Sequence, residues 1–190
     1  MKRFTADFET STWCFDETWV WAWSLCDIAN PENVEVGNSI EGFFERIKKE
    51  NNPYIYFHNL KFDGEFILFY LMKNGYEWVE SREKRTNTFS TLISDMGLFY
   101  SIEVYFEVGK KVRKVTFIDS LKIINQTVES MPKTFKIPEN KLVIDYNLPR
   151  EKGHVLTEDE VSYVKNDVVI VAKALSYLFE MGLTKMTAGS

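Results

Sequence analysis

Residues 3–10 read Arg-Phe-Thr-Ala-Asp-Phe-Glu-Thr, and the fold class follows from this stretch and its neighbours. Apolar side chains alternate with polar ones here, which predicts a strand that buries one face. The other face carries Asp7 and Glu9, two carboxylates that point the same way about 6.6 Å apart along the strand. One cation could bridge them. An exposed acidic pair on an edge strand has the same pattern, so the pair does not identify a site by itself.

Outward from this stretch, strand and helix patterns alternate along the chain. The predicted elements are strands at residues 3–10, 18–25 and 54–57, helices at 40–47, 60–73 and 157–179, and a strand-rich region at 86–118. The first two strands are expected to pair as a hairpin, with Trp19, Trp21 and Trp23 on one face of the second. We therefore expect the α/β class, with a central mixed β-sheet flanked by helices and an additional β-hairpin region.

Size and composition indicate one compact domain. The chain has 190 residues, 45% hydrophobic and 15% aromatic, which is enough for one core and short for two. We expect a single domain over residues 1–190 with a strand-rich insertion at about 86–118.

Cys14 and Cys26 have no metal-ligand spacing, and neither a secretory leader nor a long apolar stretch is present. These features predict a soluble, cytoplasmic protein without disulfides and without a membrane partner.

The formal net charge of −5 argues against a protein that grips nucleic acid by bulk charge. It does not exclude nucleic acid, because a chain that holds divalent cations collects carboxylates at its site.

The densest basic run comprises Lys110, Lys111, Arg113 and Lys114. We expect it to be a solvated hairpin tip, with a phosphate contact as the alternative. His154 is expected to be an exposed loop residue without a partner.

Polar residues gather again where the strand at 54–57 gives way to the next helix. Residues 58–64 read His-Asn-Leu-Lys-Phe-Asp-Gly and stand at the end of a buried strand, which is where sites form in α/β sheets. Asp63 would then face the edge of the sheet, and Gly64 would let another segment approach closely. Helix capping, or a favourable place for an acidic residue in a first helical turn, is the alternative interpretation of Asp63.

The last predicted helix opens with a capping box formed by Thr157 and Glu160. Within this helix Tyr163 and Asp167 stand four residues apart and share a face. Asp167 lies on the flank of the apolar stripe, where an unpaired carboxylate would be costly. We therefore expect Asp167 to have a partner, and we favour this over a solvated surface charge.

The joint pattern is more specific than its parts. Asp-x-Glu on a first strand, Asn-x-x-x-Asp after a later strand and Tyr-x-x-x-Asp in a late helix resemble the DEDD exonuclease superfamily, tyrosine subclass. Residues 7–10, 56–64 and 186–190 look like the amino-terminal proofreading domain of protein-primed family B DNA polymerases of small bacteriophages. The resemblance covers essentially the whole chain and implies a ribonuclease-H-like fold. The chain departs from that family at residues 125–127, where an apolar, proline- and aromatic-containing stretch is expected.

The resemblance implies a role for each matching residue. Asp7, Glu9, Asp63 and Asp167 would be the metal carboxylates, Tyr163 would orient the attacking water, and Lys141 would contact the phosphate under attack. Ser120 and Leu121 match a motif that binds single-stranded DNA, and further strand-binding residues are expected at Thr10, His58, Asn59, Phe62 and Tyr146. Core packing is the alternative for Phe62 and Leu121.

Hard oxygen ligands without a Cys/His set indicate Mg²⁺ or Mn²⁺ rather than zinc. Two ions are expected, one to generate hydroxide and one to steady the departing 3' oxygen roughly 4 Å away. The implied activity is 3'-5' hydrolysis at single-stranded DNA 3' ends, which releases nucleoside 5'-monophosphates. Tyr163, with an ordinary pKa of about 10, suits the orientation of water better than proton abstraction.

The implied partners are the 3' end of single-stranded DNA and, in that family, a polymerase domain and a terminal protein. Two other functions stay open. One is a stand-alone exoribonuclease or oligoribonuclease, because no residue here visibly reads a 2'-hydroxyl. The other is a catalytically idle module that binds single-stranded DNA or a terminal protein in the same cleft. Neither a Ser-Leu-Tyr-Pro nor an Asp-Thr-Asp-Ser polymerase motif is present, so we expect no nucleotide incorporation.

Overall fold

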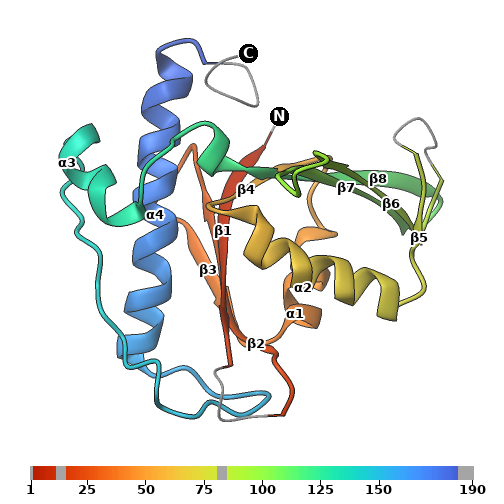
Figure 1. The fold of residues 1–190 in the computed structure, drawn as a ribbon, viewed down its shortest axis with the longest axis horizontal. Coiled ribbons are helices and arrows are strands. Elements are labelled where there is room, and N and C mark those ends of the chain that lie inside the picture. The colour runs from red at the N-terminus through yellow and green to blue at the C-terminus, as the bar shows by residue number, and fades with distance from the viewer. Residues whose placement is uncertain (1, 12–15, 81–84, 184–190) are drawn as a thin grey trace.

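The computed structural model describes residues 2–11, 16–80 and 85–183 (Figure 1). Cys14 and the expected family motif at 186–190 lie outside these ranges. The strands are β1 (Arg3–Thr10), β2 (Val20–Asp27), β3 (Val34–Gly37), β4 (Tyr54–Phe57), β5 (Glu77–Trp78), β6 (Thr88–Ile93), β7 (Phe99–Val108) and β8 (Lys111–Asp119). The helices are α1 (Ile40–Ile47), α2 (Leu60–Lys73), α3 (Met131–Phe135) and α4 (Glu158–Glu180), with short 3-10 turns η1 (Ser120–Lys122) and η2 (Val128–Ser130). Within these ranges no helix is both long and apolar enough to cross a bilayer.

The described strands form one mixed sheet in the order β3-β2-β1-β4-β8-β7-β6-β5. β4 runs parallel to both of its neighbours, β1 and β8, whereas the hairpins β1–β2 and β7–β8 are antiparallel. α1 and α2 cover one face of the sheet and α4 covers the other (Figure 1). This is the expected α/β architecture with helices on both faces.

The alternation in β1 separates two cores. Phe8 belongs to the aromatic cluster beneath α1 and α2, and its ring centroid lies 4.9 Å from that of Phe43. On the opposite face, the hydroxyl of Thr5 donates to the backbone carbonyl of Val168 on α4 at 2.8 Å. The two residues that follow Thr5 on its face of the strand are the carboxylates at positions 7 and 9. They therefore face α4.

The expectation that the three tryptophans share a face is wrong. The β1–β2 ladder skips Trp21 at a bulge opposite Glu9 and Thr10. The extra residue turns Trp21 toward Tyr163 on α4, whereas Trp23 stays on the side of α1. A bulge changes which face the following side chains occupy, and the alternation of the sequence alone does not reveal it.

β4 is short, and its early end opens the site. Only Arg3–Ala6 of β1 pair with β4, because β4 ends at Phe57. The chain then turns into α2 through Asn59, whose φ of 77° lies in the left-handed region that asparagine tolerates. The rest of β1 runs past the end of β4 and alongside the first turn of α2.

The β7–β8 hairpin turns where expected, and part of its basic run is structural. Nη1 of Arg113 donates to the backbone carbonyls of residues 48–50 at 3.2 to 3.4 Å, and so satisfies the end of α1. Lys114 pairs with Glu103 at 2.8 Å. The expectation of a solvated tip holds for residues 110–111, which are exposed.

Candidate active site

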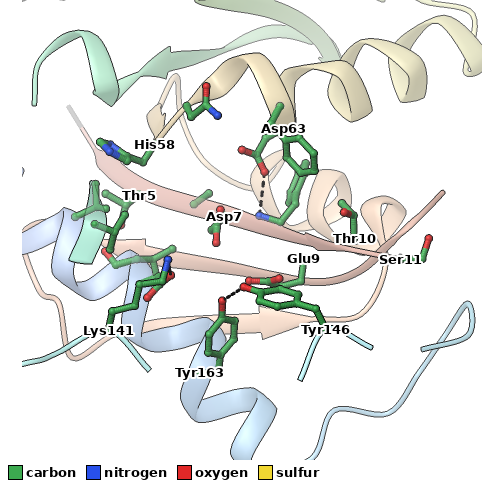
Figure 2. Close-up of a pocket in the computed structure, with 18 residues that line it drawn as sticks. Thr5, Asp7, Glu9, Thr10, Ser11, His58, Asp63, Lys141, Tyr146 and Tyr163 are labelled. Atoms are coloured by element: carbon green, nitrogen blue, oxygen red, sulfur yellow. Dashed lines mark hydrogen bonds and ion pairs between the residues drawn. The ribbon is translucent and has the colours of Figure 1, made fainter. Parts of the chain in front are cut away.

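A cavity of about 390 Å³ opens beside β1, between the start of α2 and the middle of α4. Figure 2 shows side chains from these three elements converging on it. All the site residues expected from the sequence line this cavity except Ser120 and Leu121. The three motifs, which are far apart along the chain, therefore meet in one place.

Asp7 and Glu9 form the β1 side of the cavity. Burial and the charge of Asp167 raise the pKa of Asp7 to about 7. The pKa of Glu9 rises to about 9, because burial and the charges of both aspartates oppose its ionisation. Without cations, the site therefore resists the full ionisation of its own carboxylates.

Asp63 reaches β1 from the first turn of α2. It is 3% exposed, and its Oδ1 accepts a hydrogen bond from the N–H of Phe8 at 3.2 Å. That N–H faces Asp63 because β4 has already ended. Burial, followed by the charge of Asp7, raises the pKa of Asp63 well above its usual range. Gly64 lets α2 lie close to the sheet, since a Cβ there would stand 3.2 Å from the Phe99 ring.

Asp167 closes the cavity from α4. The sequence predicts that Asp167 has a partner, and in the structure this partner is Lys141. Nζ of Lys141 lies 3.5 Å from Oδ2 of Asp167. Burial raises the pKa of Asp167 even though Lys141 acts to lower it. Burial acts to lower the pKa of Lys141 in turn, yet Asp167 holds it above its usual value. Lys141 is therefore a cation at the edge of the cavity.

Tyr163 stands one helical turn before Asp167, and its hydroxyl is hydrogen-bonded to that of Tyr146 (Figure 2). The Tyr163 side chain is 3% exposed. Burial and the nearby Glu9 hold the pKa of Tyr163 above its usual value. The phenol stays protonated at neutral pH, so it can orient a water molecule and is a poor proton acceptor.

The donor set fits divalent cations by its chemistry. Hard carboxylate oxygens are the ligands of Mg²⁺ and Mn²⁺, and Oδ1 of Asp167 is buried without a hydrogen-bond partner in the described part of the chain. The set is not preassembled: among the described residues, no three His, Cys, Asp or Glu side chains are arranged to hold an ion. Asp63 is held by Phe8 and Asp167 by Lys141. Cations would have to draw these carboxylates away from their protein partners.

Three of the expected strand-binding residues are available to a ligand. Thr10, Asn59 and Phe62 line the cavity. Phe62 is 50% exposed, which favours a contact surface over core packing.

His58 and Ser120 are engaged with the protein itself. Nδ1 of His58 lies 3.0 Å from Oγ of Ser120, and Nε2 donates to the Gln126 carbonyl at 2.8 Å. Burial lowers the pKa of His58, which favours the neutral ring. Ser120 is fully buried and Leu121 partly buried, and neither lines the cavity. In this structure Ser120 and Leu121 therefore do not face the cavity, and Ser120 supports the site through its hydrogen bond with His58.

Asp119, at the end of β8, was missed by the sequence reasoning. It is 1% exposed, and its Oδ1 accepts from the backbone N–H groups of Asn59, Leu60 and Leu121 at 3.0 to 3.2 Å. Asn59 starts α2 without a side-chain cap of its own, so Asp119 supplies the acceptor from a distant strand. One carboxylate thereby ties the start of α2 to η1. An acidic residue that ends a buried strand was the available signal.

Arg150, also missed, anchors the loop that carries Tyr146. Arg150 is 4% exposed, its Nε donates to Glu160 Oε1 at 2.6 Å, and its guanidinium lies 4.3 Å from the Trp21 ring. Its Nη1 donates to the backbone carbonyls of residues 145 and 148, on either side of Tyr146. A buried arginine therefore holds a loop that has no regular secondary structure.

The expectation for His154 is wrong, because this residue belongs to the same anchor. Nε2 of His154 lies 2.7 Å from Oε2 of Glu160, and the ring packs edge-on against Trp21. Burial acts to raise the pKa of Glu160, but hydrogen bonds from Thr157, Arg150 and His154 hold it at about 2. The capping-box glutamate therefore also fixes the loop.

The chain is similar to bacteriophage DNA polymerases over its whole length. Residues 44–156 match the family model described as DNA polymerase type B, organellar and viral. The chain is 42% identical to the DNA polymerase of Bacillus phage Nf and 39% identical to that of Bacillus phage phi29, over 190 residues in both cases. It is 30% identical to the DNA polymerase of Streptococcus phage Cp-1 over 201 residues. These matches cover 32% of each relative, so the chain spans about a third of their length.

Solved structures agree with this result. Phi29 DNA polymerase complexed with single-stranded DNA matches 99% of this chain with a TM-score of 0.90 and 37% identity, and the match covers 33% of that polymerase. Its complex with primer-template DNA matches with a TM-score of 0.89. The expected ribonuclease-H-like α/β fold is therefore confirmed.

Proposed function

Because the chain belongs to the type B DNA polymerases of organelles and viruses, we propose that residues 1–190 form a 3'-5' exonuclease domain that proofreads for a polymerase. The substrate is the 3' end of single-stranded DNA, and the products are nucleoside 5'-monophosphates. One observation carries the proposal: Asp7, Glu9, Asp63 and Asp167 surround a single cavity with Tyr163 and Lys141 at its edge. Such a set is suited to hydrolysis of a phosphodiester.

The four carboxylates would hold two Mg²⁺ or Mn²⁺ ions. When bound, such ions activate water and neutralise the charge that develops on the phosphate and the departing 3' oxygen. Burial and neighbouring negative charges raise the pKa values of Asp7, Glu9 and Asp63. Bound cations would offset this cost of ionisation, so the raised pKa values support the proposal.

The protein's own residues would bind and orient the reactants. Tyr163, kept protonated, holds the attacking water, and the hydroxyl of Tyr146 fixes the direction of the Tyr163 hydroxyl. Lys141, whose ammonium lies 3.5 Å from Asp167 at the edge of the cavity, would contact the phosphate. The exposed ring of Phe62 offers a surface on which the terminal base can stack.

The experiment is a gel of 5'-labelled single-stranded DNA and RNA oligomers incubated with the protein and Mg²⁺. A ladder of shortened DNA supports the proposal. A ladder from RNA alone would favour the exoribonuclease, and intact oligomers that still bind would favour the idle binding module. We also expect this chain to add no nucleotides to a primer, and template-directed extension would contradict that.

The similarity to bacteriophage DNA polymerases, of which this chain spans about a third, supports a proofreading role beside a polymerase portion. In that setting the 3' end would move between the polymerase and this cavity. A terminal protein is the further partner in this proposal, and the host cytoplasm is the expected location.

A further inference from the structure

A second cavity, of about 470 Å³, lies between α2, the start of α1 and the segment that enters β2. Much of its wall is aromatic: Phe66 and Phe69 come from α2, and Trp19 comes from the segment before β2. Lys73 and Lys152 also line it. These residues, called the aromatic groove below, have no part in the chemistry proposed above.

Phe62, Phe66, Phe69 and Lys73 lie on one face of α2, because spacings of three and four residues follow the helical repeat. Phe62 is 50% and Phe69 64% exposed, whereas Phe66 between them is partly buried and packs against the core. The rings of Phe62 and Phe66 are 5.8 Å apart, and Nζ of Lys73 lies 5.9 Å from the Phe69 ring. The row from Phe62 to Phe69 is roughly 10 Å long at the helical rise. Two exposed rings beside a partly buried one form an apolar surface of the kind that binds a partner or ligand.

The aromatic groove is continuous with the candidate active site on two sides. On α2, Phe62 lines the first cavity and its ring partner Phe66 lines the groove. Across the β1–β2 connection, the N–H of Ser11 donates to the Trp19 carbonyl at 2.9 Å, and the N–H of Trp19 donates to Oγ of Ser11 at 3.0 Å. α2 begins beside β1 and leads away from it (Figure 1). A strand that leaves the first cavity along α2 therefore enters the groove.

Charges along the groove nearly balance. Lys152 pairs with Glu17 at 3.1 Å and lies 5.4 Å from the Trp19 ring. Lys73 and Glu41 also line the groove. A surface with ring faces and little net charge favours stacking of bases over capture of phosphates by bulk charge.

We propose that the aromatic groove binds the bases of a nucleic-acid strand that lie on the 5' side of the nucleotide in the active site. The bases stack on Phe69 and its neighbouring rings. This inference rests on the exonuclease function proposed above and extends its substrate from the terminal nucleotide to a longer strand. Every base has a face that can stack, so the groove is indifferent to sequence and favours length.

The test compares 5'-labelled DNA oligomers of three and eight nucleotides in single-turnover degradation with Mg²⁺. The protein concentration at half-saturation reports affinity, and the plateau reports the rate of the bound substrate. Phe69→Ala is expected to raise the half-saturation for the octamer about 5- to 150-fold, the range for the loss of one stacked base. The half-saturation for the trimer and the plateau rates of both oligomers should not change. Phe69→Trp should restore the wild-type half-saturation for the octamer.

Met72→Ala is the matched control, because Met72 is a 61% exposed apolar residue of α2 outside the groove. It should leave both oligomers unaffected. An octamer that lacks bases at the fourth and fifth positions from its 3' end should bind the wild type at least as weakly as the intact octamer binds Phe69→Ala.

Equal half-saturation of the wild type and Phe69→Ala on the intact octamer would overturn the proposal and would leave this face to a protein partner. Full affinity in Phe69→Leu would also overturn it, because leucine keeps apolar bulk without a ring. Failure of the wild type to degrade either oligomer would count against the exonuclease function itself.

Discussion

At the scale of single residues, Asp7 and Asp167 line the same cavity, and the charge of Asp167 opposes the ionisation of Asp7. If they serve the same ions, Asp7→Ala or Asp167→Ala should reduce the degradation of single-stranded DNA by several orders of magnitude, since each removes a ligand. Single-turnover rates measure this. Asp95→Ala, which removes an exposed carboxylate, should keep the wild-type rate. A tenth of the wild-type rate in either site variant, with an intact fold, would favour the idle binding module.

Tyr163→Phe should cost less, about ten- to a thousand-fold in the same assay, because it removes one positioning hydrogen bond and no metal ligand. Tyr146→Phe should cost less again, since its hydroxyl acts through that of Tyr163. A loss in Tyr163→Phe as deep as that in Asp167→Ala would assign the phenol a larger role than orientation.

Asp119 acts on the site through the backbone. Asp119→Ala leaves three N–H groups without their acceptor, so it should lower the free energy of unfolding by about 1–3 kcal/mol or more and weaken binding of single-stranded DNA. Asp119→Asn keeps an oxygen in place and should recover most of both properties. Urea unfolding and half-saturation in the single-turnover assay measure them. If the two variants were equally impaired, the charge of Asp119 would matter more than its geometry.

At the scale of elements, the parts with strong periodicity were predictable from sequence. The apolar stripe of α1 and the capping box of α4 are local signals, and their predicted starts are confirmed. β3 and β5 were not predicted, because strands of four and two residues are too short to give a clear periodic signal. The face of Trp21 was not predicted either, since a bulge depends on the partner strand.

The site was predictable where its residues form motifs and not where they act through space. Tyr163 and Asp167 share a helix face, so their spacing is informative. The contact of Asp119 with Asn59 spans sixty positions, and no local pattern records it. The loop that carries Tyr146 depends on Arg150 in the same way, because tertiary bonds hold its irregular backbone.

That loop gives a prediction at the element scale. Arg150→Met leaves the buried Glu160 with only His154 and the Thr157 N–H as partners, so the free energy of unfolding should fall by up to about 3–5 kcal/mol, as measured by urea unfolding. Lys152→Met is the control, because it breaks an ion pair with Glu17 whose side chains are 65% and 77% exposed. It should cost less than about 1 kcal/mol. Equal costs for the two variants would mean that Arg150 does not anchor the loop.

At the scale of the whole molecule, the acidic charge and a nucleic-acid substrate are compatible. Two bound divalent ions would cancel most of the formal charge of −5. Matches along the whole chain confirm the resemblance to family B polymerases of bacteriophages, including Bacillus phage phi29. The local charge around the cavity, rather than the net charge of the chain, therefore bears on whether nucleic acid can bind.

The metal-free protein should become more stable as the pH falls from about 9 to about 5. Folding raises the pKa of Asp7 from 3.8 to about 7 and that of Glu9 from 4.5 to about 9, so the folded state binds more protons in this window. Below it the sign reverses, because protonation of Glu160, whose folded pKa is about 2, weakens its bonds with Arg150 and His154. Melting temperatures in EDTA across this range measure the effect. A maximum at the alkaline end would contradict it.

Glu9→Gln separates this electrostatic cost from other effects of pH. Glutamine keeps the shape of Glu9 without a charge that folding must neutralise, so the variant should melt above the wild type in EDTA at pH 8. A relief of about 1 kcal/mol corresponds to about 2–4 °C for a domain of this size. The difference should shrink toward pH 5, where the unfolded chain also begins to take up the proton.

With millimolar Mn²⁺ the order should reverse, because the ions bind the folded wild type and Glu9→Gln lacks one ligand. Glu107→Gln, which removes an exposed charge on β7, should melt with the wild type in every condition. Equal melting of the wild type and Glu9→Gln in EDTA, with no response to Mn²⁺, would mean that Glu9 does not share ions with the aspartates. The cavity would then lack the one property that distinguishes a two-ion site from an ordinary cleft, namely carboxylates that repel each other until cations bind.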